Sequence, residues 1–235
     1  MAEDIRDRHH RIFGRGESTE RLVFFSDAVF AIAMTLLVLD IRLPELPDDT
    51  NLLVPLGQLW PQIFAYALSF LLIALNWVTH HRKFRVIVRY DTVLIWINMV
   101  LLLLIAFLPF PTSVLAAYSP QPTNVILYAA TVASVSIVGA VMWAYAYRAG
   151  LMSDEIDTEM NKYVWRSFWP APAVFLLSIP IAVFQPVWAM FFWIAIWPVS
   201  RIADHVGLSR RVPRAKDVSR SSARRSPDSA SEEDH

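Results

Sequence analysis

Cysteine is absent from the 235 residues of the chain. Disulfide bonds, cysteine-ligated zinc, iron–sulfur clusters and thiol nucleophiles are therefore excluded. Glycine is scarce as well, with six residues, and none of them belongs to a G-x-x-x-x-G-K phosphate-binding loop. ATP-driven transport by such a loop is excluded on that ground.

Charged residues are also scarce in the chain. Only 18% of the residues are Asp, Glu, Lys or Arg, against about 25% in an ordinary soluble domain. Hydrophobic residues make up 55% of the chain, and its mean hydropathy is positive, +0.40. The charges that do occur crowd into residues 1–21, 82–91, 148–166 and 201–235. This segregation, with long uncharged runs between the clusters, predicts an all-α membrane protein.

Six apolar windows are long enough to cross the hydrocarbon core, which takes roughly 17–25 residues. They cover residues 22–43, 57–79, 93–117, 123–147, 164–185 and 186–204. Only the corner Gln185-Pro186 separates the last two windows, which contain five prolines. Prolines are tolerated in membrane helices whose neighbours satisfy the freed carbonyl groups. We expect two kinked spans here, and a single re-entrant hairpin is the alternative.

The basic residues predict the orientation of the spans. Five arginines precede or open the first span, and Arg82, Lys83, Arg85 and Arg89 follow the second. The segments after the first and third spans carry no Lys or Arg. Because short cytoplasmic loops are enriched in Lys and Arg, we expect both termini in the cytoplasm.

Three regions follow from this pattern. We expect a cytoplasmic N-terminal segment at residues 1–20, with no cleavable signal peptide because it is charged and polar. A six-helix transmembrane domain follows over residues 21–206. Residues 207–235 are rich in Ser, Arg, Asp and Glu, so we expect a disordered cytoplasmic tail.

The first span contains an ionisable residue, Asp27, directly after Ser26. Ionisable groups inside a membrane span are costly and usually face other helices or water. Ser and Asp also suit the start of a helix, where they accept backbone N–H bonds. The residues alone leave both readings open, a bracing group inside the span and a helix cap.

The same span carries an aliphatic stripe. At about 100° per residue, Ile32, Leu36 and Leu39 fall within roughly 60° of one another, and Thr35 flanks them. Asp27 lies about 140° from Ile32 on the same wheel. Such a stripe is typical of a packing seam between helices, although a ring of aliphatic side chains can also gate a pore by dewetting.

Three motifs carry a resemblance to a known family. Residues 21–40 read R-x-x-x-F-S-D followed by A-V-F-A-I-A-M-T-L-L-V-L-D, residues 76–84 read N-W-x-x-H-H-x-x-F, and residues 108–112 read L-P-F-P-T. Together they resemble the lysosomal/endosomal potassium channel family, and more narrowly its prokaryotic members with six spans per subunit. The resemblance covers about residues 20–205.

The resemblance implies a homotetramer in which the first helix of each subunit surrounds a central pore. It assigns the constriction, or gate, to Ile32, Leu36 and Leu39, and places the selectivity-associated hydroxyl of Thr35 near the narrowest point. It also implies a motif that braces the pore helix, made of Arg21, Phe25, Ser26 and Asp27. Their expected partners in a polar network are His80, His81 and Asn98.

The resemblance thus implies a passive potassium-permeable channel in the inner (plasma) membrane. No glycine forms a TVGYG-type filter, so selectivity would come from side chains and pore width. We expect the partners to be other copies of the chain, the lipid bilayer and potassium ions, with no nucleic acid, cofactor or metal and no enzymatic activity. A proton-coupled or other secondary transporter and a non-conducting membrane scaffold are the alternatives.

The adjacent pair His80-His81 raises the question of a metal site. Neighbouring residues on a helix point about 100° apart, so one ion cannot easily take both side chains. No H-E-x-x-H spacing occurs in the chain either. Structural hydrogen bonding is the expected role of this pair, and a pH-sensitive one is the alternative, because histidine changes its charge near neutral pH.

Overall fold

The computed structural model describes residues 19–42, 56–57, 59–118 and 120–193, and all of its regular elements there are helical apart from one isolated β-bridge. Within these described ranges, five helical segments are long and apolar enough to cross a membrane. The helices are α2 (Thr19–Leu36), the 3-10 helix η1 (Leu37–Asp40), α4 (Trp60–Val86), α5 (Thr92–Phe107), α6 (Pro109–Ala117), α7 (Pro122–Arg148), α8 (Thr158–Ser167), α9 (Pro170–Phe184) and α10 (Pro186–Phe192).

Prolines and acidic caps explain where several helices begin. Proline lacks the backbone N–H that a helix interior needs, and it is well tolerated in the first turn. Accordingly, α6, α7, α9 and α10 each have a proline in the first turn. Asp91 caps α5, since its Oδ1 accepts from the Leu94 N–H at 2.8 Å, and Asp157 caps α8 by accepting from the Met160 N–H at 2.6 Å.

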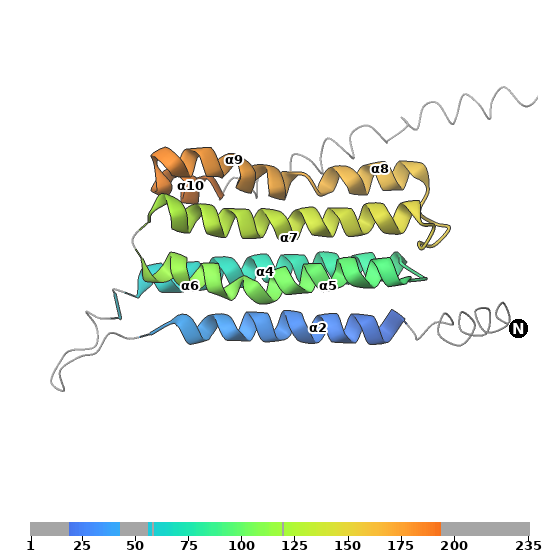
Figure 1. Cartoon of the computed structure of the whole chain (residues 1–235), viewed down its shortest axis with the longest axis horizontal. Coiled ribbons are helices and arrows are strands. Elements are labelled where there is room, and N and C mark those ends of the chain that lie inside the picture. The colour runs from blue at the N-terminus through green and yellow to red at the C-terminus, as the bar shows by residue number, and fades with distance from the viewer. Residues whose placement is uncertain (1–18, 43–55, 58, 119, 194–235) are drawn as a thin grey trace, which may run out of the picture.

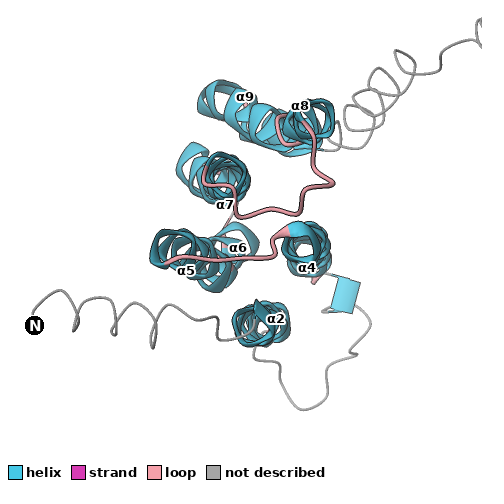
Figure 2. Ribbon diagram, turned by 90° about the vertical axis from the view of Figure 1, so that its right-hand side faces the viewer, coloured by secondary structure: helices cyan, strands magenta, loops and turns pink. Residues whose placement is uncertain are grey.

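The helices lie side by side in layers (Figure 1). α2 forms one edge, α4 and the α5–α6 pair come next, then α7, and α8–α10 form the opposite edge. An end-on view places α2 beside α4 and α5 and away from α7–α9 (Figure 2). Only 22% of the apolar window of α2 is buried, against 56% for α7. The central helix is therefore α7, and α2 has a whole side without a neighbour among the described residues.

The first five predicted spans correspond to helices, with the third built from α5 and α6 and the fifth from α8 and α9. The corner at Gln185-Pro186 is confirmed, because α9 ends at Phe184 and α10 begins at Pro186. The sixth predicted span, 186–204, is described only to residue 193 and stays a prediction. Most of the segment 1–20 and all of the tail 207–235 lie outside the described residues.

The prediction that Arg82, Lys83 and Arg85 lie in a loop is wrong. α4 continues through Val86, beyond the end of its apolar run, and carries all three residues in its last two turns. Arg82 and Arg85 are exposed, but Lys83 is buried, with 6% of its surface accessible. The helix extends this far because it has a protein neighbour on the Lys83 side, which a hydropathy window does not reveal.

The two connections at this end of the bundle are joined to each other. The backbone N–H groups of Val88 and Arg89 donate to the carbonyl of Leu151, and the Ser153 N–H donates to the carbonyl of Val86. Gly150, with φ of 64°, turns the chain after α7, and its carbonyl accepts from the Arg89 guanidinium at 2.8 Å. The α4–α5 and α7–α8 connections therefore form one unit.

Candidate functional site

One face of α2 packs against its own subunit. Ser26, Phe30, Ala33 and Leu37 are at most 1% exposed, and their spacing of four, three and four residues is that of a single helix face. This face contacts α4 and α5. The polar member, Ser26, therefore points into the bundle rather than toward the free side of the helix.

The opposite face of α2 carries the predicted constriction residues. Ile32 is 58% exposed, Leu36 43% and Leu39 64%, so none of the three has a full set of neighbours within the subunit. Thr35 is exposed as well, and its hydroxyl donates to the carbonyl of Ile32 at 2.9 Å. Leu37–Asp40 form a 3-10 turn, in which side chains three apart eclipse, so Leu36 and Leu39 lie almost in line along the axis.

The alternative that Asp27 caps the start of a helix is wrong, because α2 begins at Thr19. Asp27 sits within the helix, partly buried, and its Oδ1 accepts a hydrogen bond from the indole Nε1–H of Trp77 on α4 at 2.8 Å. This bond joins α2 to α4 through side chains of both helices.

A second polar connection runs from α2 through α5 to α4. The amide Nδ2 of Asn98 donates to the Ser26 hydroxyl at 3.0 Å, and that hydroxyl donates to the carbonyl of Leu22 at 2.8 Å. The Asn98 Oδ1 lies 2.9 Å from Nε2 of His80. Ser26, His80 and Asn98 are all buried, so the three helices share one polar connection away from solvent.

The rest of the predicted network is placed differently. His81 is exposed, and its ring lies 5.8 Å from that of Trp77 rather than beside Asn98. Phe25 is 52% exposed on the free side of α2. Arg21 is exposed near the start of the helix, and it has an interaction partner there.

Sequence reasoning missed Trp77 as the partner of Asp27. It stands three residues before His80 in the N-W-x-x-H-H motif, and this spacing places both side chains toward the same side of α4. The helical spacing was the available signal, but a tryptophan in an apolar run is usually read as part of a lipid interface.

A cavity of about 290 Å³ lies between the starting end of α2 and the final turns of α4. Its lining mixes charges of both signs with apolar groups and comprises Glu20, Val23, Phe24, Asp27, His81, Phe84 and Arg85. In the described part of the chain, no three His, Asp or Glu side chains come together as metal ligands. The site thus consists of a braced helix with a free aliphatic face.

Comparison with known proteins places the chain in a family. A sequence profile described as "Endosomal/lysosomal potassium channel TMEM175" matches residues 21–109. A protein named as a potassium channel from Chamaesiphon minutus is 35% identical over 176 residues, covering 72% of this chain and 86% of the relative. A zebrafish (Danio rerio) protein named "Endosomal/lysosomal proton channel TMEM175" is 28% identical over 71% of this chain, which spans 32% of that longer relative.

A solved structure shares the fold. The crystal structure of a lysosomal potassium-selective channel TMEM175 homologue from Chamaesiphon minutus superimposes with a TM-score of 0.69 at 29% identity, and the match covers 79% of this chain and 98% of the other. The apolar helices and the relatives agree on a multi-pass membrane protein. The chain therefore belongs to the TMEM175 family, whose named members are ion channels.

Proposed function

We propose that this chain is one subunit of a passive potassium-permeable channel, a homotetramer in which α2 of each copy lines a central pore. The observation that carries the proposal is the division of α2 into two faces. Its carboxylate and buried hydroxyl bind α4 and α5, whereas Ile32, Leu36 and Leu39 stay largely exposed within the described part of the subunit. If these three side chains formed a packing seam within the subunit, neighbouring helices would cover them.

The proposed constriction is hydrophobic. Four copies of Leu36, with Ile32 and Leu39 on either side along the helix, make apolar rings that gate water and ions by dewetting. Thr35 supplies a hydroxyl beside these rings, and we assign it to ion selection. Because no TVGYG-type loop occurs in the chain, discrimination between potassium and sodium is expected to be modest.

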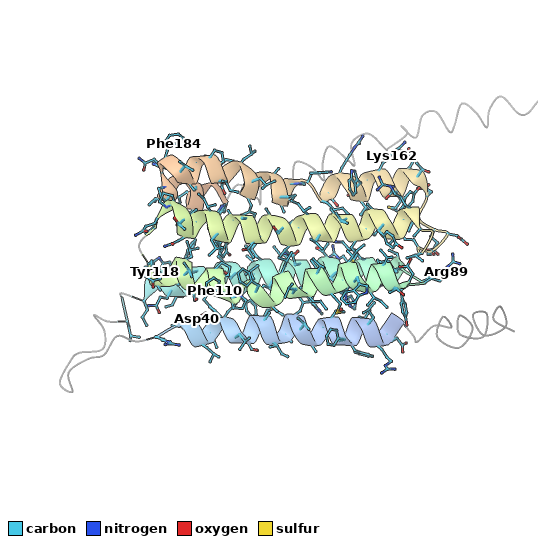
Figure 3. The ribbon with its side chains drawn as sticks, viewed as in Figure 1. Asp40, Arg89, Phe110, Tyr118, Lys162 and Phe184 are labelled. Carbon is cyan, nitrogen blue, oxygen red and sulfur yellow. The ribbon has the colours of Figure 1, made fainter. Side chains whose placement is uncertain are left out.

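We further propose that the channel lies in the plasma membrane, the inner membrane of a bacterium, with both termini in the cytoplasm. Figure 3 shows Arg89 and Lys162 at one end of the bundle and Asp40, Tyr118 and Phe184 at the other. The end with Arg89 also carries Arg82, Arg85 and Arg148, so it is the end expected to face the cytoplasm.

The test is potassium flux through purified protein in liposomes. Leu36→Ala removes three carbon atoms from each of four side chains around the pore, so we expect it to widen the constriction and raise the flux severalfold. Leu103→Ala is the matched control, since Leu103 on α5 is also apolar and 67% exposed but does not face the proposed pore. Absence of flux in the wild type and in Leu36→Ala, with the tetramer intact, would refute the proposal.

A proton-permeable channel is the second candidate, because the zebrafish relative is named a proton channel. A pH-sensitive dye inside the same liposomes distinguishes proton entry from potassium entry. A coupled transporter, in contrast, would move potassium against its gradient when a proton gradient is applied, and Asp27→Asn would abolish that uptake. Passive flux that follows the potassium gradient alone would exclude coupling.

A further inference from the structure

Lys83 is a buried ammonium group that the proposed pore does not use. Its Nζ donates to the backbone carbonyl of Gly139 on α7 at 2.7 Å and lies 4.5 Å from the ring centroid of Phe168, between α8 and α9. Among the described residues, no carboxylate pairs with it. A carbonyl and an aromatic face are thus the only groups shown to compensate the buried charge.

The direction of the side chain is unusual for a lysine near a helix end. Lysines close to the end of a membrane helix ordinarily extend toward the interface and keep the ammonium in water. Lys83 instead points away from the helix end. Its acceptor, the carbonyl of Gly139, belongs to a residue nine positions before the end of α7 at Arg148, or about 13 Å along that helix. The ammonium therefore reaches toward the middle of the bundle.

Gly139 has no side chain, which leaves room for the Lys83 Nζ beside the backbone of α7. A Cβ atom at position 139 would lie 3.0 Å from the Lys83 Nζ, closer than nearly all real Cβ contacts. A glycine inside a helix is unfavourable by about 1 kcal/mol relative to alanine, so its presence here calls for a reason. The close approach of the ammonium to the backbone supplies that reason.

Lys83 is also the third of three donors spaced three residues apart on α4. Trp77 binds Asp27 on α2, His80 binds Asn98 on α5, and Lys83 binds Gly139 on α7. Three residues turn a helix by about 300°, so each donor is rotated by about 60° from the one before it. The end of α4 thus holds the proposed pore helix on one side and the outer helices on the other.

We propose that Lys83 is a positioning residue, which fixes α4 against α7 and the α8–α9 junction and thereby sets the position of the side chains that hold α2. Its effect on conduction rests on the proposed function, whereas its effect on helix packing does not. The aliphatic rings of four α2 helices attract one another across a water-filled pore. Loosening α4 therefore lets them approach, and the flux falls.

Stability alone does not account for such a group. Replacing a buried charge with an apolar side chain of similar size is often neutral or stabilising, because the cost of desolvating the charge disappears. Lys83→Met keeps the apolar stem and ends one atom short of Nζ. We expect it to leave the Tm of the full-length tetramer in detergent unchanged or raised, while potassium flux in liposomes falls by on the order of 2- to 10-fold, the effect expected of contacting residues.

The decisive experiment is a double-mutant cycle with Gly139→Ala. In the wild-type background the added methyl group forces the Lys83 Nζ to shift, so the flux falls and the Tm rises less than it does in the Lys83→Met background. In the Lys83→Met background the same methyl group has room, so the flux is unchanged and the Tm rises by about 2–4 °C, because alanine is a better helix former than glycine by about 1 kcal/mol. Arg82→Met, beside Lys83 on α4 and exposed, is the control and is expected to behave as the wild type.

Three results would overturn the proposal. The first is a Tm that falls by several degrees in Lys83→Met with an unchanged flux per folded tetramer, which would make the bond merely structural. The second is an additive effect of the two substitutions on flux, and the third is a flux loss in Arg82→Met as large as in Lys83→Met. If the wild type carries no potassium flux, the proposed function fails, and only the Tm values of the double-mutant cycle test the packing role of Lys83. Additive changes in Tm would then reject the contact between Lys83 and Gly139.

Discussion

The bond between Trp77 and Asp27 allows the bracing of α2 to be tested without measuring conduction. Trp77→Phe keeps an aromatic ring on α4 and removes the indole N–H that donates to the carboxylate at 2.8 Å. Asp27→Ala removes the acceptor oxygen from α2. Neither substitution changes the aliphatic face of α2, so the tetramer is expected to assemble in both.

Two estimates bound the size of the effect. Hydrogen bonds to charged groups in soluble proteins are worth about 1.5–3 kcal/mol. Hydrogen bonds between helices in a membrane protein average only about 0.6 kcal/mol and reach about 1.7, because the unfolded chain also finds partners there. Asp27 is partly exposed beside a cavity, which favours the lower range. We therefore expect a coupling between Trp77 and Asp27 of about 0.6–1.7 kcal/mol.

The measurement is reversible unfolding in mixed micelles for the wild type, both single variants and the double variant. The cycle separates the loss of the hydrogen bond from the loss of side-chain volume in Trp77→Phe, because the volume change affects the free energy of unfolding equally with and without Asp27. Trp96→Phe is the control for the ring change, since Trp96 is 67% exposed and makes no hydrogen bond among the described residues. A coupling indistinguishable from zero would show that the carboxylate does not hold α2 to α4.

Two further substitutions address buried hydroxyl groups, with the same unfolding measurement. Ser26→Ala leaves an amide N–H of Asn98 without its acceptor, so we expect the free energy of unfolding to fall by about 1 kcal/mol. Ser69→Ala removes a partner of the fully buried Tyr128 hydroxyl, 2.9 Å away, and should cost about 1–2 kcal/mol. The exposed Ser113→Ala is the control, and a cost there equal to that of Ser69→Ala would contradict the assignment.

Much of the architecture could be predicted because membrane helices obey a strict rule. In a bilayer each backbone polar group needs an internal partner, so long apolar runs form helices, and the first five windows do so. The break within the third window was not predicted, although Pro109 marks it by starting α6 after Leu108. A hydropathy window averages over a proline, whereas the missing backbone N–H of that proline interrupts the hydrogen bonding of the helix.

The polar contacts were only partly predictable. Ser26, His80 and Asn98 are recognised as a group through the resemblance, and the structure joins them by hydrogen bonds. His81 follows His80 directly and therefore points about 100° away, which explains why it is outside this group. The charge pattern places Lys83 in a cytoplasmic loop after the second span, and it cannot reveal the two acceptor groups, which lie on α7 and beyond α8, far away in the sequence.

The absence of cysteine makes the central claim directly testable, since a single introduced thiol has no competitor in the chain. The measurement is potassium flux before and after treatment of Leu36→Cys with a charged methanethiosulfonate reagent, compared with Leu103→Cys on the surface of α5. If α2 lines the pore, the reagent blocks flux through Leu36→Cys and leaves Leu103→Cys unchanged. Full labelling of Leu36→Cys with undiminished flux would contradict the account.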